Sequence, residues 1–186
     1  MNEILPQTYL IGLIVLLGGA AVVVARQILR VRSDEVTLAR LEGARDKDQV
    51  QDSASLYELA SVQLRKRLFG QASDNLKRAL QRASEEGAPR EAQALIQNAL
   101  GFSLAAQSNY QAAIRHYRSA VKAKPDYAVA LNNLAFALEK QGKPEDAMAT
   151  YGKVLALDPA NATARKRLNT LERRSGTSPE SADRRR

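Results

Sequence analysis

The sequence predicts an all-α protein: an N-terminal transmembrane helix, an α-solenoid of three helix-turn-helix repeats, and a C-terminal capping helix. Two observations lead to this prediction. One long stretch near the N-terminus has no charged residue, and a block of 34 residues recurs later in the chain. A fixed period in this range is typical of solenoid proteins, in which each repeat buries its apolar face against its neighbours.

The apolar stretch predicts a transmembrane helix at residues 4–25. These 22 residues carry no charge, and no other stretch of the chain is comparably long. A hydrocarbon core about 30 Å thick needs roughly 20 helical residues to cross it. The length therefore suits one membrane span.

The charges around this stretch favour a retained anchor over a cleaved signal peptide. A signal peptide has a positive segment before its apolar run, whereas here Glu3 precedes the run and three arginines follow it between 26 and 32. Because basic residues stay on the cytoplasmic side, we expect everything after Arg26 to be cytoplasmic or stromal. Residues 26–52 are expected to form a juxtamembrane helical linker.

Composition limits the chemistry that the chain can perform. It has no cysteine and a single histidine, His116, so disulfides, thiolate chemistry and histidine-based metal sites are not expected. We predict no catalytic residue, no metal site and no cofactor. The net charge is +8, and residues 162–186 carry eight basic and three acidic side chains. This balance favours acidic protein partners or anionic lipid headgroups.

The repeat has a clear frame. Residues 94–127 and 128–161 align without a gap, each block being 34 residues long, and a third block begins at Ser53. The first repeat carries seven extra residues, expected as a longer second helix and turn, so the predicted repeats are 53–93, 94–127 and 128–161. Small residues recur where two helices of a hairpin would cross: Ala60, Gly101, Ala135, Ala72, Ala113 and Ala147.

These features resemble the tetratricopeptide repeat (TPR), which has a 34-residue period, small residues at the helix crossing and a proline after the second helix. Pro125 and Pro159 occupy that last position, whereas the tryptophan usual at position 4 is missing. Solenoids need a polar cap, and residues 162–174, with Leu168 and Leu171 on an otherwise charged helix, are expected to supply it. Residues 175–186 are expected to be a disordered basic tail.

The TPR resemblance implies a groove lined by the first helix of each repeat, which binds a protein partner. Position 6 often carries an amide that holds a peptide backbone. The predicted groove residues are Tyr57, Ser61, Asn98, Phe102, Asn132, Asn133 and Phe136.

Two interpretations of the groove phenylalanines, Phe102 and Phe136, stay open. They form a partly exposed pair that contributes most of the binding energy, or they pack between neighbouring helices. Chaperone-binding TPRs grip a carboxylate with a lysine and an asparagine where this chain has Tyr57 and Ser61, which argues against that specificity.

The second helices are predicted to form a basic outer face. Such a face is commonly only a solvated surface; the alternative is contact with anionic lipid or an acidic protein. Nucleic acid is poorly supported, because no aromatic residues alternate with the basic ones. The residues of this face are Lys77, Arg78, Arg115, Arg118 and Lys122.

A narrower resemblance covers nearly the whole chain except the tail. The single span, the following "RQILRVR", and the segments "LYELASVQLRKRLFGQA" and "KPDYAVALNNLAFALEKQGKPEDA" are similar to TPR photosystem I assembly proteins of cyanobacteria and chloroplasts. This resemblance implies a thylakoid protein that assists photosystem I assembly, with photosystem I subunits or assembly intermediates as partners and membrane lipid around its span. The alternative is a general bacterial scaffold that recruits cytoplasmic proteins to the membrane. An enzyme is the weakest interpretation.

Overall fold

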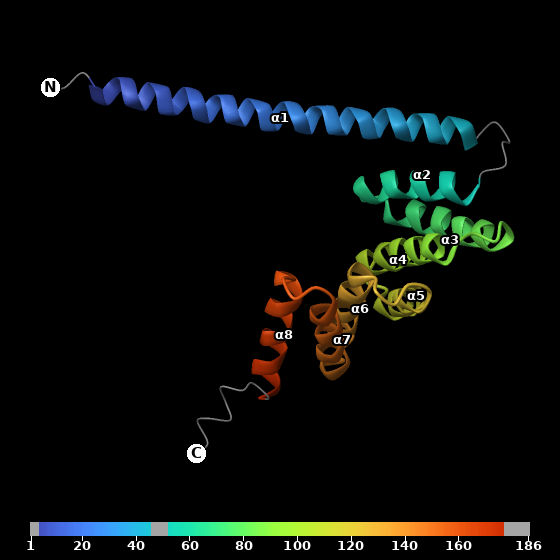
Figure 1. Ribbon diagram of the computed structural model, residues 1–186. Helices are drawn as coiled ribbons and strands as arrows, with labels where there is room; N and C mark the ends of the chain where they lie inside the picture. Colours follow the sequence, from blue (N-terminus) through green and yellow to red (C-terminus); the bar gives the residue numbers. More distant parts are fainter. Residues whose placement is uncertain (1–3, 46–51, 177–186) are drawn as a thin grey trace, which may run out of the picture. The chain divides into compact units, whose positions relative to one another are not determined.

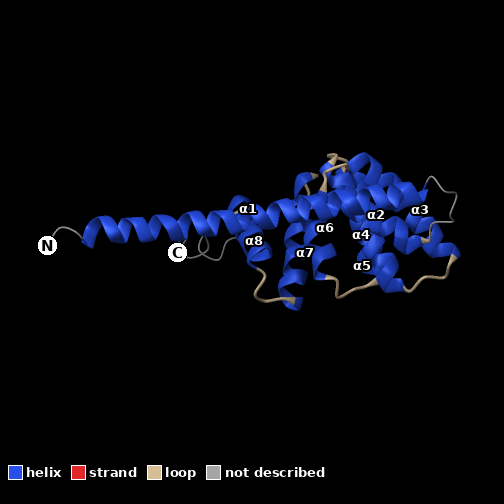
Figure 2. Cartoon of the chain, turned by 90° about the horizontal axis from the view of Figure 1, so that it is seen from above, coloured by secondary structure: helices blue, strands red, loops and turns tan. Residues whose placement is uncertain are grey.

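The computed structural model describes residues 4–45 and 52–176, and within these ranges it contains eight α-helices and no strand (Figures 1 and 2). The all-α prediction is confirmed. The chain divides into two units, Met1–Gln49 and Val50–Arg186. The helices are α1 (Ile4–Arg45), α2 (Ser53–Arg65), α3 (Phe69–Glu85), α4 (Arg90–Ala106), α5 (Tyr110–Ala123), α6 (Ala128–Lys140), α7 (Pro144–Leu157) and α8 (Ala162–Ser175).

The first unit is one continuous helix of 42 residues, α1. Its segment Ile11–Leu29 is long and apolar enough to cross a membrane, and none of it is buried against other parts of the chain. This segment begins and ends later than the predicted span at 4–25, and it includes Arg26. The expected linker is helical as far as Arg45, while the rest of it, residues 46–51, lies outside the described residues.

The second unit is a stack of antiparallel helix pairs. The pairs α2–α3, α4–α5 and α6–α7 each pack within a repeat, and α3–α4, α5–α6 and α7–α8 join one pair to the next (Figure 1). Contacts thus run mainly between helices that are neighbours in sequence, as in a solenoid. The predicted capping helix corresponds to α8, which ends at Ser175, one residue later than expected, and is followed by Gly176 in the left-handed conformation. The predicted tail beyond that glycine, residues 177–186, lies outside the described residues.

Small side chains allow the two helices of each pair to approach closely. Gly101 on α4 is buried against the ring of Tyr117 on α5. A Cβ atom at position 101 would stand 2.7 Å from Cε1 of that ring, which is well inside van der Waals contact. Repeat 3 has an alanine at the equivalent position, Ala135, which is also fully buried.

The extra residues of repeat 1 are divided among three elements. Helix α3 extends to Glu85, a short turn follows, and α4 starts at Arg90, four residues before the predicted start of repeat 2 at Ala94. Gly87 adopts a φ of +63° in this turn, a conformation that glycine reaches without steric cost. The turn is tied back to the start of α2, because the Ser53 backbone N–H donates a 3.0 Å hydrogen bond to the Glu86 carboxylate.

Candidate protein-binding groove

The first helices of the repeats, α2, α4 and α6, carry the predicted groove residues. Three apolar side chains on α4 and α6 remain in solvent: Leu95 is 42% exposed, Phe102 45% and Val129 55%. Their positions, 2 and 9 of the repeat, share one face of a helix by the 3.6-residue period. We call these three residues the apolar groove row. Exposed apolar side chains that share a face mark surfaces that bind other molecules.

A chain of side-chain hydrogen bonds joins α4 to α6. The Asn133 amide donates to Asn98 Oδ1 at 3.0 Å, and the Asn98 amide donates to the Tyr127 hydroxyl at 3.3 Å. The Asn133 amide group, which the TPR resemblance assigned to a bound peptide, is thus hydrogen-bonded to the neighbouring repeat. Sequence reasoning missed Tyr127, because it precedes α6 and so falls outside the groove positions on the helix. Burial, followed by the nearby Tyr57, raises the pKa of Tyr127, and the bond from Asn98 opposes this rise.

The two groove phenylalanines have different surroundings. Phe102 makes an edge-to-face contact with Phe69, with ring centroids 6.5 Å apart and planes inclined at 72°. Phe136 is half-buried, with Arg167 5.1 Å and Lys140 5.5 Å from its ring centroid. The ring partner of Phe102 is therefore Phe69 on α3. Phe102 alone of the two is well exposed.

The capping helix contributes a cation to the groove. Arg167 on α8 donates to both oxygens of Glu139, at 3.1 and 3.3 Å. The Tyr151 hydroxyl lies 3.5 Å from the same carboxylate. Burial, with a further contribution from Glu139, raises the pKa of Tyr151 to about 12, while Arg167 acts in the opposite direction. Repeat 3 is thereby tied to the cap across the groove face.

The remaining predicted groove residues are partly satisfied within the protein. Ser61 Oγ donates to the Tyr57 carbonyl at 2.8 Å. Tyr57 is partly buried and packs against the hydrophobic cluster formed by α2, α3 and α4. The Asn132 amide donates to Asn161 Oδ1 at 3.3 Å, but Asn132 Oδ1 is buried and has no hydrogen-bond partner within the described part of the chain. A buried acceptor without a donor costs free energy.

The predicted basic outer face is exposed. Lys77 forms an ion pair with Asp74 at 3.1 Å, and both side chains are in solvent, where such a pair adds little stability. The other four residues of this face have no ion-pair partner within the described part of the chain. They are Arg78, Arg115, Arg118 and Lys122.

His116 has a structural environment. Its Nδ1 lies 2.7 Å from Gln97 Oε1. Burial, followed by the positive charges of Arg115 and Lys77, lowers its pKa, which favours the neutral ring. Among the described residues, no group of three or more histidine, cysteine, aspartate or glutamate side chains could hold a metal ion.

Comparison with known proteins identifies the repeats. Two family models, both described as tetratricopeptide repeat, match residues 52–126 and 104–168. The chain belongs to the tetratricopeptide repeat family. TPR domains are protein-interaction scaffolds, and no enzyme family matches among these findings.

Curated relatives of this TPR chain include a plant protein. The chain is 33% identical over 168 residues to the tetratricopeptide repeat domain-containing protein PYG7, chloroplastic, of Arabidopsis thaliana, covering 90% of this chain and 54% of that protein. It is 33% identical to ycf37 of Cyanophora paradoxa over 114 residues, covering 61% of this chain and 64% of the relative. It is 29% identical to ycf37 of Guillardia theta over 171 residues, covering 92% and 94%.

These relatives confirm the resemblance to the TPR photosystem I assembly family. The chain spans a little over half of PYG7 and somewhat less than two thirds of the Cyanophora protein.

Solved structures confirm the TPR solenoid. The crystal structure of MamA matches with a TM-score of 0.68 and 18% identity, covering 78% of this chain and 81% of MamA. The first TPR domain of Spaghetti (RPAP3) bound to an HSP90 peptide matches with a TM-score of 0.62 and 18% identity, covering 69% and 96%. At this identity the likeness concerns the fold alone.

Proposed function

We propose that this TPR chain is a membrane-anchored scaffold that holds a photosystem I subunit or assembly intermediate at the thylakoid membrane, with its repeats on the cytoplasmic or stromal side. The observation that carries the proposal is the similarity to chloroplastic PYG7 along 90% of the chain. An alignment of that length includes part of α1 as well as the repeats. The relative therefore shares more than an isolated TPR domain.

The N-terminal helix supports the anchor. Helix α1 leaves the side chains of Ile11–Leu29 fully outside any protein core, and such a surface is stable in hydrocarbon rather than in water. The basic residues that follow favour the cytoplasmic or stromal side of the membrane for the repeats. Anchoring confines the repeats near the membrane and raises their effective concentration for a partner there without any added contact.

The apolar groove row supports the scaffold role. Side chains of this kind gain free energy when a partner removes them from water, at roughly 25 cal/mol for each Å² buried. Lys140 beside Phe136 adds positive charge to the same face, whereas the charge of Arg167 is paired with Glu139. A partner segment that joins apolar and acidic residues would fit this face.

The decisive experiment deletes the gene in its photosynthetic host and measures photosystem I and photosystem II per cell. We expect photosystem I to fall while photosystem II stays constant, because the scaffold serves one complex. Complementation with Leu95→Lys and Val129→Lys together should fail, since both substitutions place charge in the apolar groove row. The matched control is Leu68→Lys, at a 37% exposed leucine in the turn after α2, which should restore photosystem I.

Unchanged photosystem I, including under stress light, would contradict the photosystem assignment and leave a general membrane scaffold. A version without residues 1–25 tests the anchor separately. Its full rescue would remove the role of the membrane while keeping the assembly function. In the host membranes, the full chain should also resist extraction by alkaline carbonate, and its release would contradict a membrane-spanning α1.

A further inference from the structure

A second surface lies at the junction of repeats 2 and 3, on residues other than those of the apolar groove row. Helices α5, α6 and α7 enclose a pocket of about 670 Å³. Three leucines of α6 form its floor, and the walls come from the second helices of the two repeats. We call this pocket the outer groove; its floor residues are Leu131, Leu134 and Leu138.

The corresponding place in repeat 2, which we call the first junction, holds a smaller and more polar pocket. It measures about 320 Å³ and is lined by residues of α4 and α5, among them Gln97, Ser119 and Lys122. By the 34-residue alignment, Gln97 corresponds to Leu131 of the outer groove, and Lys122 corresponds to Ala156. The same backbone frame thus carries polar side chains at one junction and apolar ones at the next.

Two more differences between equivalent positions of repeats 2 and 3 explain why the outer groove is open. His116, which bonds to Gln97 at the first junction, corresponds to Thr150 at the second. The Thr150 hydroxyl donates to the Asp146 carbonyl of its own helix at 2.7 Å, so its polar atom is already satisfied. Arg115 at the first junction corresponds to Ala149, a smaller side chain with no charge. Repeat 3 thus carries smaller, uncharged side chains at the two positions where repeat 2 has a histidine and an arginine.

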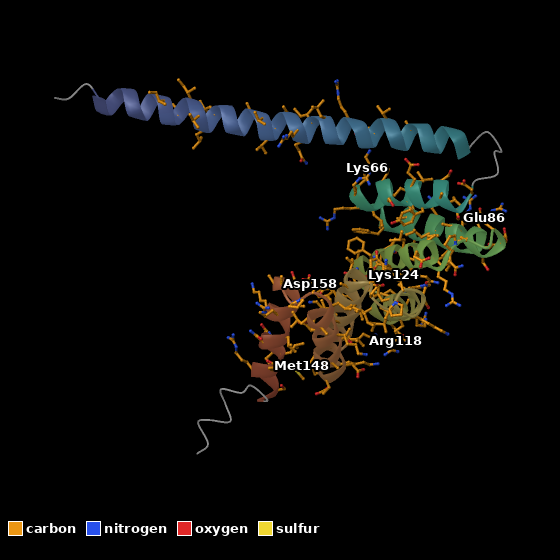
Figure 3. The ribbon with its side chains drawn as sticks, viewed as in Figure 1. Lys66, Glu86, Arg118, Lys124, Met148 and Asp158 are labelled. Carbon is orange, nitrogen blue, oxygen red and sulfur yellow. The ribbon has the colours of Figure 1, made fainter. Side chains whose placement is uncertain are left out.

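Cations stand on both walls of the outer groove. Arg118 on α5 (labelled in Figure 3) and Lys153 on α7 line it. Neither has an ion-pair partner among the residues that the structure describes. Asp146 is the single acidic side chain of the lining. An occupant that is apolar in the middle and negatively charged on either side would match this pattern.

We propose that the outer groove binds an apolar protein segment flanked by acidic residues, independently of the groove formed by the first helices. The charges favour this occupant over the chain's own C-terminal tail, a second copy of the chain and a lipid headgroup. The C-terminal tail of the chain is basic, and a second copy brings a net charge of +8, so both would add positive charge to a positive rim. A lipid headgroup places its charge at one point, whereas here the two cations stand on two different helices. The scaffold would then have two binding surfaces.

The test uses the full chain in phosphatidylcholine nanodiscs and two fluorescein-labelled peptides, with empty nanodiscs as the blank. One peptide has a leucine- and isoleucine-rich centre flanked by aspartate and glutamate; its twin has lysine and arginine flanks. We expect fluorescence anisotropy to show at least tenfold tighter binding of the acidic peptide. Charge reversal by Arg118→Glu with Lys153→Glu should invert this preference.

The matched variants fill the groove without adding a positive charge at position 149 or 156. Ala149→Gln with Thr150→His should weaken the binding of the acidic peptide at least tenfold. The single change Ala156→Gln, at an exposed site, serves as a second filling variant if the double one alters the circular dichroism melting curve. By contrast, Leu95→Lys with Val129→Lys should change the affinity less than twofold, because neither residue lines the outer groove.

The proposal would be overturned if the filled variants bound the acidic peptide as tightly as the wild-type chain does. It would also be overturned if the wild-type chain bound the two peptides with equal affinity. A loss of self-association or of co-purified lipid on filling would overturn it as well, because the groove would then hold a second copy or an acyl chain. The photosystem function is tested on the apolar groove row instead, so that either proposal can fail while the other stands.

Discussion

Repeats 2 and 3 have equal length and align residue for residue, yet they differ at the helix crossing, in the turn and on the outer side. Gly101 faces Tyr117 in repeat 2, whereas Ala135 occupies the crossing position of repeat 3. The turn between the helices has Ser108 in the left-handed conformation in one repeat and Gly142 in the other. A few small residues therefore preserve the packing of the two helices in each repeat, while the remaining positions are free to form different surfaces.

The largest effect is expected at the crossing. Gly101→Leu should lower the free energy of unfolding by about 3 kcal/mol, because the added side chain meets the buried Tyr117 ring. Circular dichroism melting of the full chain measures the loss. Gly101→Ala should cost less, since it adds only the Cβ atom, although the ring must still move away from that atom. A normal melting transition for the leucine variant would contradict the repeat register.

The groove phenylalanines should separate binding from stability. Phe102→Ala should weaken partner binding by about 1 kcal/mol or more and leave the melting temperature nearly unchanged, because the ring is 45% exposed. Phe136→Ala should lower stability as well, since it removes a half-buried ring and its contacts with two cations. If Phe102→Ala unfolds the domain instead, that ring belongs to the core.

Substitutions in the turns between the two helices of a repeat should have smaller effects on stability, with opposite signs in repeats 2 and 3. Arg67 and Ser108 both adopt a φ of +62° at the position that Gly142 fills in repeat 3. Ser108→Gly should stabilise the protein by about 0.5–1 kcal/mol, because relief of left-handed strain exceeds the entropy that glycine loses on folding. Gly142→Ser should destabilise it by a similar amount. Thermal melting of both variants checks the sign, and shifts in the same direction would contradict the explanation.

The smallest effect concerns His116, which Thr150 replaces in repeat 3. Its pKa in the folded chain is lowered from 6.5, mainly by burial, so the folded state binds its proton less readily than the unfolded state. The stability linked to this group is therefore present above about pH 6.5 and is lost as the pH falls below that value. Wild-type protein should lose more stability between pH 7.5 and 5.5 than His116→Gln does, as urea unfolding at each pH would measure. Equal losses would show that this ring is not the sensitive group.

The sequence by itself determined the repeat frame and the apolar character of α1. The repeat frame follows from periodicity, because small residues return wherever two helices of a repeat cross. The apolar character of α1 follows from its local composition, because an uncharged stretch can be recognised without knowing what surrounds it. The insertion in repeat 1 was harder to place, because a turn of several residues can be shared between two helix ends. Helix α4 therefore begins at Arg90, ahead of the predicted repeat boundary.

Only the tertiary structure decided what each groove residue contacts. Phe102 lies against Phe69, Asn133 bonds to Asn98, and Arg167 reaches Glu139 from the cap. The two hydrogen bonds join residues that lie 35 and 28 positions apart in the sequence. A pattern within one helix cannot reveal contacts at that separation. Periodicity tells which side of its own helix a residue occupies. What meets it there depends on the side chains that the packed neighbouring repeat brings to the same place.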